Sequence, residues 1–341
     1  AATPLRIRRP EGAPVSAADA GGLGHDLSRI IEHRSFVAAR DEVISSIREH
    51  DGLEPLILPV LGPTRVGKTE LLNAVKAEVD EPTVGPRSTV ATPSFGVSDV
   101  PAKPNARTLL QAMAAACGFR ASRRDETDQL AERLKTWIED FHVVGIALDE
   151  FTHCQNSQSN FDQKDAADYL KMIADRTRIV IVIAGLPSLQ DMIDKSPQLQ
   201  ARCAESVMVL PYDWRDEDHR DAFYEACLYG FEVLNRHGVT LSLDEPEAVV
   251  RLYGASAGRV GLMLRLLRET AKRVRAKRSL GLEELAAAAS RSFRRQVVDR
   301  SFFDGPEPDE ERLVRSYAEL CRTSGVAFDV QSVRDIDLGT A

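Results

Sequence analysis

The sequence predicts an α/β fold in which helices cover both faces of a parallel sheet, followed by an all-helical domain. Short apolar runs alternate with amphipathic helical segments over residues 34–213, as in three-layer αβα folds. One of these runs leads into a glycine-rich phosphate-binding motif, and another ends in two adjacent carboxylates. Beyond residue 213 the composition becomes helical, which predicts a second domain over residues 214–300 and an acidic tail over residues 301–341.

The composition is that of an ordinary globular protein, with 43% apolar and 28% charged residues among 341. No apolar run approaches the roughly 20 residues that span a bilayer, and no signal-peptide pattern is present, so no membrane partner is expected. The five cysteines are scattered without a C-x-x-C pair, which favours reduced thiols and a cytoplasmic location.

Charge is distributed unevenly along the chain, although the net charge is −8. Residues 259–300 contain twelve Lys/Arg against four Asp/Glu, whereas residues 301–341 contain four against nine. Two interpretations are open: a nucleic-acid-binding face beside an acidic interaction tail, or solvated helix surfaces.

The segment Leu56–Leu72 carries the phosphate-binding motif, G-x-x-x-x-G-K-T between an apolar run and the start of an amphipathic helix. Glycines allow the backbone to turn its N–H groups inward around an anion, and the helix adds the positive end of its dipole. Lys68 is expected to reach the β- and γ-phosphates, and Thr69 to offer its hydroxyl to Mg²⁺. The alternative is a chance glycine-rich turn. The positions expected to contact nucleotide are Gly62, Pro63, Thr64, Arg65, Val66, Gly67, Lys68, Thr69 and Glu70.

A second segment, Phe141–Phe151, is an apolar strand that ends in Asp149 and Glu150. In a parallel sheet this end opens onto the same edge as the phosphate-binding motif. Asp149 is therefore expected to hold the Mg²⁺ shell, and Glu150 to act as the general base on the attacking water. His153 and Cys154 follow without a second pair at ligand spacing, so no metal site is predicted from them.

The other elements follow from apolar periodicity and from turn and cap residues. Residues 1–33 are rich in Ala, Gly and Pro and predict a flexible arm. In the first domain, helices are expected at residues 35–50, 68–79, 107–117, 125–140, 161–176 and 188–195, and strands at 87–95, 178–184 and 205–210. In the second domain, helices are expected at residues 216–236, 244–253, 259–278 and 282–297, with a short helix at 312–321 in the tail.

The order of these features resembles the AAA+ ATPases, and the details resemble their transposition-helper branch, the TniB/TnsC family. The segments that carry the resemblance are GPTRVGKTELL, IALDEF, IVIVIAGLPSL, QLQAR before a strand, and GASAGRVGLMLRLLRE, within residues 30–300. The resemblance implies an ATP-dependent regulator that assembles on duplex DNA as a ring or helical filament when ATP is bound. It further implies recruitment of a DDE transposase, contact with a target-selection protein of the TniQ type, and disassembly on ATP hydrolysis.

The resemblance assigns roles to three further residues. Ser188 lies where such ATPases keep a polar sensor of the γ-phosphate; otherwise it caps the following helix. Arg202, just before a strand, matches an arginine finger that reaches a neighbouring subunit's nucleotide; otherwise it forms a surface ion pair. Residues 214–300 match the helical lid that closes over the nucleotide in these ATPases. Arg259 matches the second sensor in this lid, but Gly261 stands where many members have that arginine.

The segments that face DNA in the family contain Lys103, Arg107, Arg123 and Arg124 here. Contacts of this kind are mainly to phosphates and carry little sequence specificity, and each residue could equally be a solvated charge. The basic helix at residues 259–278 is a rival DNA face. Two other functions remain open. One is an ATPase switch in signalling or secretion without a DNA role. The other is an initiator or helicase loader, which is less favoured because no winged-helix domain is expected within residues 301–341.

Overall fold

The computed structural model describes residue 27 and residues 34–84, 91–122, 126–155, 163–273, 279–294 and 297–326. The chain divides into two compact units by its contacts. We call Ser35–Val209 the α/β unit, and we call Leu210–Ala341 together with Ala1–Arg34 the helical unit.

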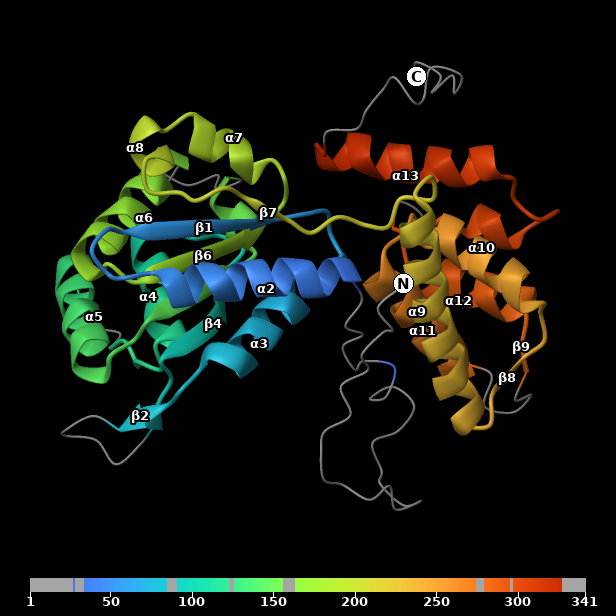
Figure 1. The fold of residues 1–341 in the computed structure, drawn as a ribbon, viewed down its shortest axis with the longest axis horizontal. Helices are drawn as coiled ribbons and strands as arrows, with labels where there is room; N and C mark the ends of the chain where they lie inside the picture. Colours follow the sequence, from blue (N-terminus) through green and yellow to red (C-terminus); the bar gives the residue numbers. More distant parts are fainter. Residues whose placement is uncertain are drawn as a thin grey trace. The chain divides into compact units, whose positions relative to one another are not determined.

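The α/β unit contains a five-stranded sheet in which all neighbouring strands are parallel. The strands stand in the order β4-β5-β6-β1-β7 (Figure 1). They are β1 (Leu56–Leu61), β4 (Phe95–Asp99), β5 (Gly145–Asp149), β6 (Val180–Gly185) and β7 (Val207–Met208). Because β1 lies between β6 and β7, the phosphate-binding motif that follows it lies beside the carboxyl ends of both strands. The predicted parallel α/β fold is confirmed.

Apolar side chains alternate between the two faces of this sheet and form a core on each. In β6, Ile181 and Ile183 belong to one core, whereas Val180 and Val182 belong to the other. The first core also contains side chains from α4 (Ala106–Ala116), α5 (Thr127–Phe141), α6 (Gln163–Thr177), α7 (Leu189–Asp194) and α8 (Pro197–Gln200). The second contains side chains from α2 (Arg34–Glu49) and α3 (Lys68–Val79) (Figure 1). Burial on both faces explains why the strands read as nearly continuous apolar runs.

The second strand of the sheet differs from the sequence-based expectation. The sequence favours a strand at residues 87–95, of which residues 87–90 lie outside the described residues, but β4 occupies Phe95–Asp99. The short strands β2 (Thr83–Val84) and β3 (Ala91–Thr92) pair antiparallel outside the sheet. The carboxylate of Asp80 accepts hydrogen bonds from the backbone N–H groups of Ser94 and Phe95, at 2.8 and 3.2 Å. The prediction is wrong because parallel pairing with β5, and not local propensity, decides where β4 begins.

The helical unit is built from helices packed around an aromatic-rich core that includes Phe223, Tyr253 and Phe302. Its helices are α9 (Glu217–Arg236), α10 (Glu245–Ser256), α11 (Val260–Arg273), α12 (Leu282–Ser292), the 3-10 helix η2 (Arg300–Phe303) and α13 (Glu310–Ser324). The predicted helical character is confirmed. One short parallel pair, β8 (Thr240–Leu241) with β9 (Ser279–Leu280), is an addition that the sequence pattern did not indicate. Among the residues described, no helix is both long and apolar enough to cross a membrane.

The helical unit continues past residue 300, into the stretch that the sequence assigns to an acidic tail. Phe302 and Phe303 are buried in its core. The guanidinium of Arg251, only 2% exposed, donates hydrogen bonds to the carbonyls of Phe302 and Gly305 at 2.9 and 3.1 Å. Residues 300–326 are therefore a packed part of this unit, while residues 327–341 lie outside the described residues.

Leu27 is the one described residue of the expected flexible arm, residues 1–33. Its side chain is 2% exposed and belongs to the core of the helical unit. At this position the segment is packed against the helical unit.

Gly254→Ala is expected to destabilise the helical unit. An added Cβ would lie 2.2 Å from two carbons of the buried Phe302 ring, so the ring or α10 must shift. We expect a loss of about 1–3 kcal/mol in the free energy of unfolding from this overpacking, measured by urea denaturation. In a Phe302→Ala background the penalty should vanish, because alanine is the better helix former. A penalty that persists there would contradict the packing of η2 against α10.

Candidate nucleotide-binding site

The phosphate-binding motif forms a loop between β1 and α3, and two glycines determine its shape. Gly62 donates a backbone hydrogen bond to the carbonyl of Gly185, at 3.1 Å, which ties the loop to the end of β6. A Cβ at Gly62 would lie 2.2 Å from the carbonyl oxygen of Val209, so no other residue fits. Gly67 has φ of 105° directly before α3, and Arg65 also has a positive φ, 70°. This backbone turns sharply into the helix N-terminus, as a phosphate-binding loop must.

Lys68 bends back over the loop. Its Nζ donates hydrogen bonds to the carbonyls of Gly62 and Pro63, at 2.7 and 2.9 Å. Burial lowers the pKa of Lys68, and the nearby carboxylates of Asp149 and Glu150 oppose that shift. A partly buried ammonium held by two neutral carbonyls would gain from an anionic partner at the same place.

Thr69 and Asp149 meet at the carboxyl end of β5. The Thr69 hydroxyl donates to Oδ2 of Asp149 at 2.5 Å, and Oδ1 of Asp149 accepts from the backbone N–H of Glu150 at 2.8 Å. Asp149 is 2% exposed. Within the described residues no group of three or more His, Cys, Asp or Glu side chains could hold a metal ion. The pair nevertheless fits Mg²⁺, which is commonly bound by one or two protein oxygens together with substrate phosphates.

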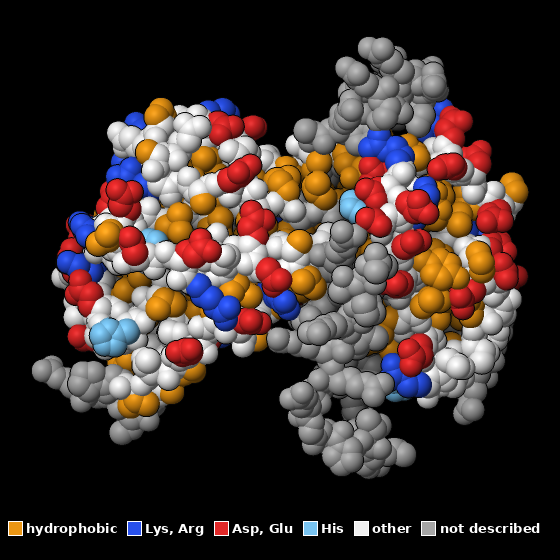
Figure 2. Space-filling view, in the orientation of Figure 1, with side chains coloured by type: hydrophobic (Ala, Val, Ile, Leu, Met, Phe, Trp, Pro, Cys, Tyr) orange, Lys and Arg blue, Asp and Glu red, His pale blue; other side chains and the backbone are white. Residues whose placement is uncertain are grey.

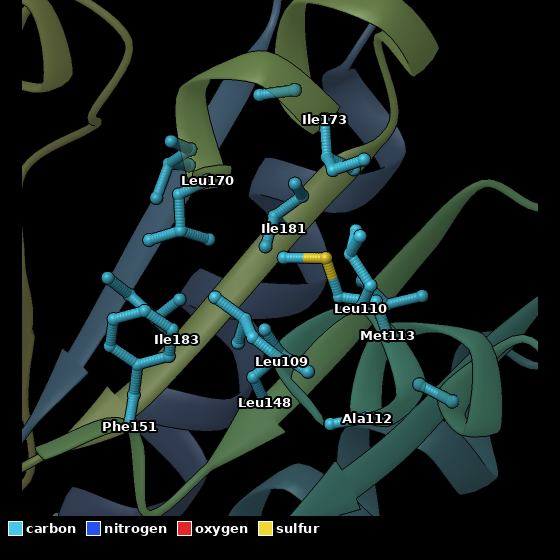
Figure 3. Close-up of a cluster of buried hydrophobic side chains, with 14 of the residues drawn as sticks. Leu109, Leu110, Ala112, Met113, Leu148, Phe151, Leu170, Ile173, Ile181 and Ile183 are labelled. Carbon is cyan, nitrogen blue, oxygen red and sulfur yellow. The ribbon is translucent and has the colours of Figure 1, made fainter. Parts of the chain in front are cut away.

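Glu150 lies next to Asp149 but is exposed, with φ of 54°. The residues on either side of this pair, Leu148 and Phe151, are fully buried. Figure 3 shows both of them in a cluster with side chains from α4 and α6. The hydrophobic core therefore anchors the two carboxylates, one turned inward to Thr69 and the other accessible to solvent.

The 3-10 helix η1 (Phe151–Gln155) connects this end of β5 to its neighbours. The Thr152 hydroxyl accepts a hydrogen bond from the backbone N–H of Leu186, at 2.7 Å, and His153 Nδ1 bonds to the carbonyl of Val100, at 2.9 Å. Sequence reasoning missed Thr152. Its contact joins segments that are far apart in sequence, and no motif marks it.

Ser188 comes directly before α7, as predicted, but its side chain does not cap that helix. Its hydroxyl donates to Oε1 of Gln155, at 2.9 Å, and Gln155 Nε2 donates to the Ser188 carbonyl, at 2.7 Å. Ser188 is thus held beside η1, the element that follows Glu150. This favours neither of the two roles considered for it, because the cap bond is absent and the hydroxyl is engaged by Gln155.

Arg202 lies at the far end of β1 from the phosphate-binding loop. Its carbonyl accepts from the backbone N–H of Ile57, at 2.8 Å, near the start of the strand. Ile57 is five residues from Gly62, a separation of roughly 16 Å along an extended strand. The Arg202 guanidinium forms a two-pronged ion pair with Asp175, and this hydrogen bonding raises the pKa of Arg202. Arg202 is therefore not brought to the site of its own chain.

Arg259 lies inside the helical unit and is 6% exposed. Its Nε donates to the carbonyl of Ser256, at 2.8 Å, and its Nη2 donates to the carbonyl of Val297, at 2.9 Å. These contacts favour a structural role over the second-sensor role suggested by its position in the sequence.

Two of the four candidate DNA-facing residues, Lys103 and Arg107, lie near the carboxyl end of β4. Lys103 is exposed in the loop after the strand, and Arg107, in the first turn of α4, donates to the carbonyl of Ser122 at 3.4 Å. Arg123 and Arg124 lie outside the described residues. On the face of the α/β unit drawn in Figure 2, basic and acidic side chains are interspersed without an extended basic patch.

The sequence matches the family described as "Bacterial TniB protein" over residues 27–213, more than half of the chain. No curated protein matches it.

Among solved structures, the ORC2 protein of Aeropyrum pernix in its ADP form has a TM-score of 0.55 and 15% identity, covering 77% of this chain and 70% of that one. The same protein in complexes with ADPNP and ADP has a TM-score of 0.52 and 15% identity, and the match covers 75% of this chain and 66% of that one. Cdc6p from Pyrobaculum aerophilum has a TM-score of 0.51 and 12% identity, and the match covers 91% of this chain and 87% of that one. At these identities the likeness shows the fold.

The family match and the fold agree with the site geometry, in which the phosphate-binding loop after β1 and the acidic pair after β5 lie at the same edge of the sheet, with β6 between the two strands. The chain belongs to the bacterial TniB proteins and is a P-loop ATPase with the AAA+ fold.

Proposed function

We propose that the chain hydrolyses Mg-ATP to ADP and phosphate and uses this cycle to control a protein assembly on duplex DNA during transposition. The observation that carries the proposal is the contact between Thr69 and the buried Asp149, with Lys68 over the same loop. Family membership supports the link to transposition.

The residues divide the chemistry among them. Lys68 exchanges its two carbonyl partners for the β- and γ-phosphates, and the loop N–H groups hold the same phosphates. Thr69 and Asp149 would hold Mg²⁺, which supplies charge neutralisation at the phosphates. Glu150, accessible beside Asp149, accepts a proton from the attacking water.

Arg202 would complete this site from a second copy of the chain. Its backbone lies at the opposite end of β1 from the loop, too far for the side chain to reach its own nucleotide. Contact between that end of one subunit and the loop edge of the next is a head-to-tail interface, which generates rings or helical filaments. Hydrolysis would then depend on assembly.

DNA binding is the step that separates this function from a nucleotide switch of another kind. We expect fluorescence anisotropy with random duplex DNA to show binding only with a non-hydrolysable ATP analogue. The affinity should fall steeply with salt, because phosphate contacts release counterions. Lys103→Ala and Arg107→Ala should each weaken binding and lower the salt slope by about one, as expected for the loss of one phosphate contact.

Lys135→Ala is the matched control, since Lys135 is a partly exposed lysine on α5 whose side chain pairs with Glu139 of the same helix. It should leave affinity and slope unchanged. Binding without ATP dependence, or no binding at any salt concentration, would favour the signalling or secretion switch. ATP-dependent binding without stimulation of a DDE transposase, or without contact to a TniQ-type partner, would favour the initiator or helicase-loader function.

A further inference from the structure

The guanidinium of Arg202 is held within its own subunit by three hydrogen bonds. Its Nε and Nη2 donate to the two carboxylate oxygens of Asp175, at 2.5 and 2.9 Å, and its Nη1 donates to the carbonyl of Gln198, at 2.6 Å. Asp175 lies near the end of α6, and Gln198 lies in the four-residue helix α8. Each of the three guanidinium nitrogens therefore has a partner on the subunit that carries it.

This geometry conflicts with a role for Arg202 at a neighbouring nucleotide. An arginine recognises a phosphate with the same planar fork of N–H donors that it presents to a carboxylate. The Nε–Nη2 edge of the fork is occupied by Asp175. A phosphate that binds this edge must displace the carboxylate.

We propose that Asp175 is a latch that holds Arg202 away from the neighbouring subunit's nucleotide until assembly displaces it. The proposal rests on the trans role of Arg202 given above. Asp175 is thus a positioning residue, and its effect on hydrolysis is exerted through Arg202.

The surroundings of the pair allow it to open. The side chains of Arg202 and Asp175 are 25% and 39% exposed, so water and an incoming phosphate have access to both. Ion pairs with this much exposure are weak, and a polyanion can compete for the cation. The link between α6 and α8 also has a second contact, from Lys171 Nζ to Oε1 of Gln198 at 2.6 Å, which does not involve Arg202. The backbone can therefore stay in place while the arginine swings out.

A mixing experiment with two inactive variants isolates the trans event. Glu150→Gln subunits carry Arg202 but lack the general base, and Arg202→Ala subunits carry the base but lack the arginine. With duplex DNA and Mg-ATP, mixed assemblies should hydrolyse ATP more than either variant alone, because only a mixed junction has both groups. Asp175→Ala is then added to the Glu150→Gln subunit. We expect kcat of the mixture to rise about two- to fivefold with KM unchanged, the range expected for loss of an exposed ion pair.

The controls separate a latch from a structural role. Glu132→Gln, in the Glu150→Gln subunit, breaks the exposed ion pair of Glu132 with Arg176, the residue next to Asp175, and should leave the rate unchanged. Asp175→Glu in the Glu150→Gln subunit keeps a carboxylate, so the mixture should return to the lower kcat measured when Asp175 is present. Asp175→Ala itself should fold, since alanine favours the helix and the lost charge lies near its carboxyl end, where an acidic residue is unfavourable.

The outcomes distinguish the proposed role of Asp175 from the proposed trans role of Arg202. If the mixture recovers activity but its kcat is unchanged or lower with Asp175→Ala, Asp175 does not restrain Arg202. The action of Arg202 at the neighbouring nucleotide is then still supported. A mixture without recovery in any combination overturns the trans arginine, and the latch with it.

Discussion

Lys68→Ala is expected to abolish measurable Mg-ATP binding, with affinity weakened by at least about a hundredfold. In the structure the ammonium holds two carbonyls of the loop, at 2.7 and 2.9 Å, in the position that the β- and γ-phosphates would take over. Two charge-assisted hydrogen bonds of about 1.5–3 kcal/mol each account for a loss of this size. Isothermal titration calorimetry with Mg-ATP measures it directly.

Lys76→Ala provides the matched control on the same helix. Lys76 lies in the last turn of α3, two turns beyond Lys68, and it is half-buried. Its replacement should leave ATP affinity unchanged, and both variants should keep the wild-type melting temperature without nucleotide. If Lys68→Ala bound Mg-ATP as tightly as the wild type, the site would have to lie elsewhere.

The geometry of the candidate nucleotide site could be predicted from the sequence because its signals are local. The loop, the helix that starts at Lys68, and the strand that ends in Asp149 each lie within one short segment, and each forms as predicted. The meeting of Thr69 with Asp149 followed from a general rule, that parallel strands open at a common edge. The prediction did not require knowledge of contacts between side chains that are distant in the sequence.

The features that sequence reasoning missed depend on pairing between distant segments. The start of β4 is set by Asp80 and by pairing with β5, and the engagement of Arg202 is set by Asp175 on another helix. The region after residue 300 reads as an acidic tail because DGPEPDEE is polar. Its packing depends on the buried side chains of Phe302 and Phe303, two residues that give no periodic signal.

The location of the acidic pair predicts that one carboxylate can be removed without losing the proposed function of the other. Asp149 is buried and bonded to Thr69, so we assign it to the proposed Mg-ATP binding site. Glu150 is exposed, and its backbone N–H bonds to Asp149, so neutralising its side chain leaves that contact in place. The two residues should therefore give different phenotypes: loss of binding from Asp149 and loss of turnover from Glu150.

Glu150→Gln is accordingly expected to lower kcat by about 10²–10⁴-fold, the usual contribution of a general base, with ATP affinity close to that of the wild type. Because the nucleotide is retained, the ATP-dependent assembly on DNA should persist. Its dissociation from labelled duplex should slow in proportion to the lost hydrolysis. Single-turnover hydrolysis and anisotropy decay on the same sample measure both quantities.

Glu150→Asp makes the test specific for a positioned base. It keeps a carboxylate but withdraws it by one methylene, so the proton acceptor remains while its distance to the attacking water increases. We expect a rate between those of the wild type and Glu150→Gln, together with a DNA-bound lifetime that is intermediate in the same order. A Glu150→Gln protein that hydrolyses ATP at the wild-type rate would refute the base. An Asp variant as inactive as the Gln variant would mean that the water tolerates no displacement, because the backbone at φ of 54° fixes where this side chain begins.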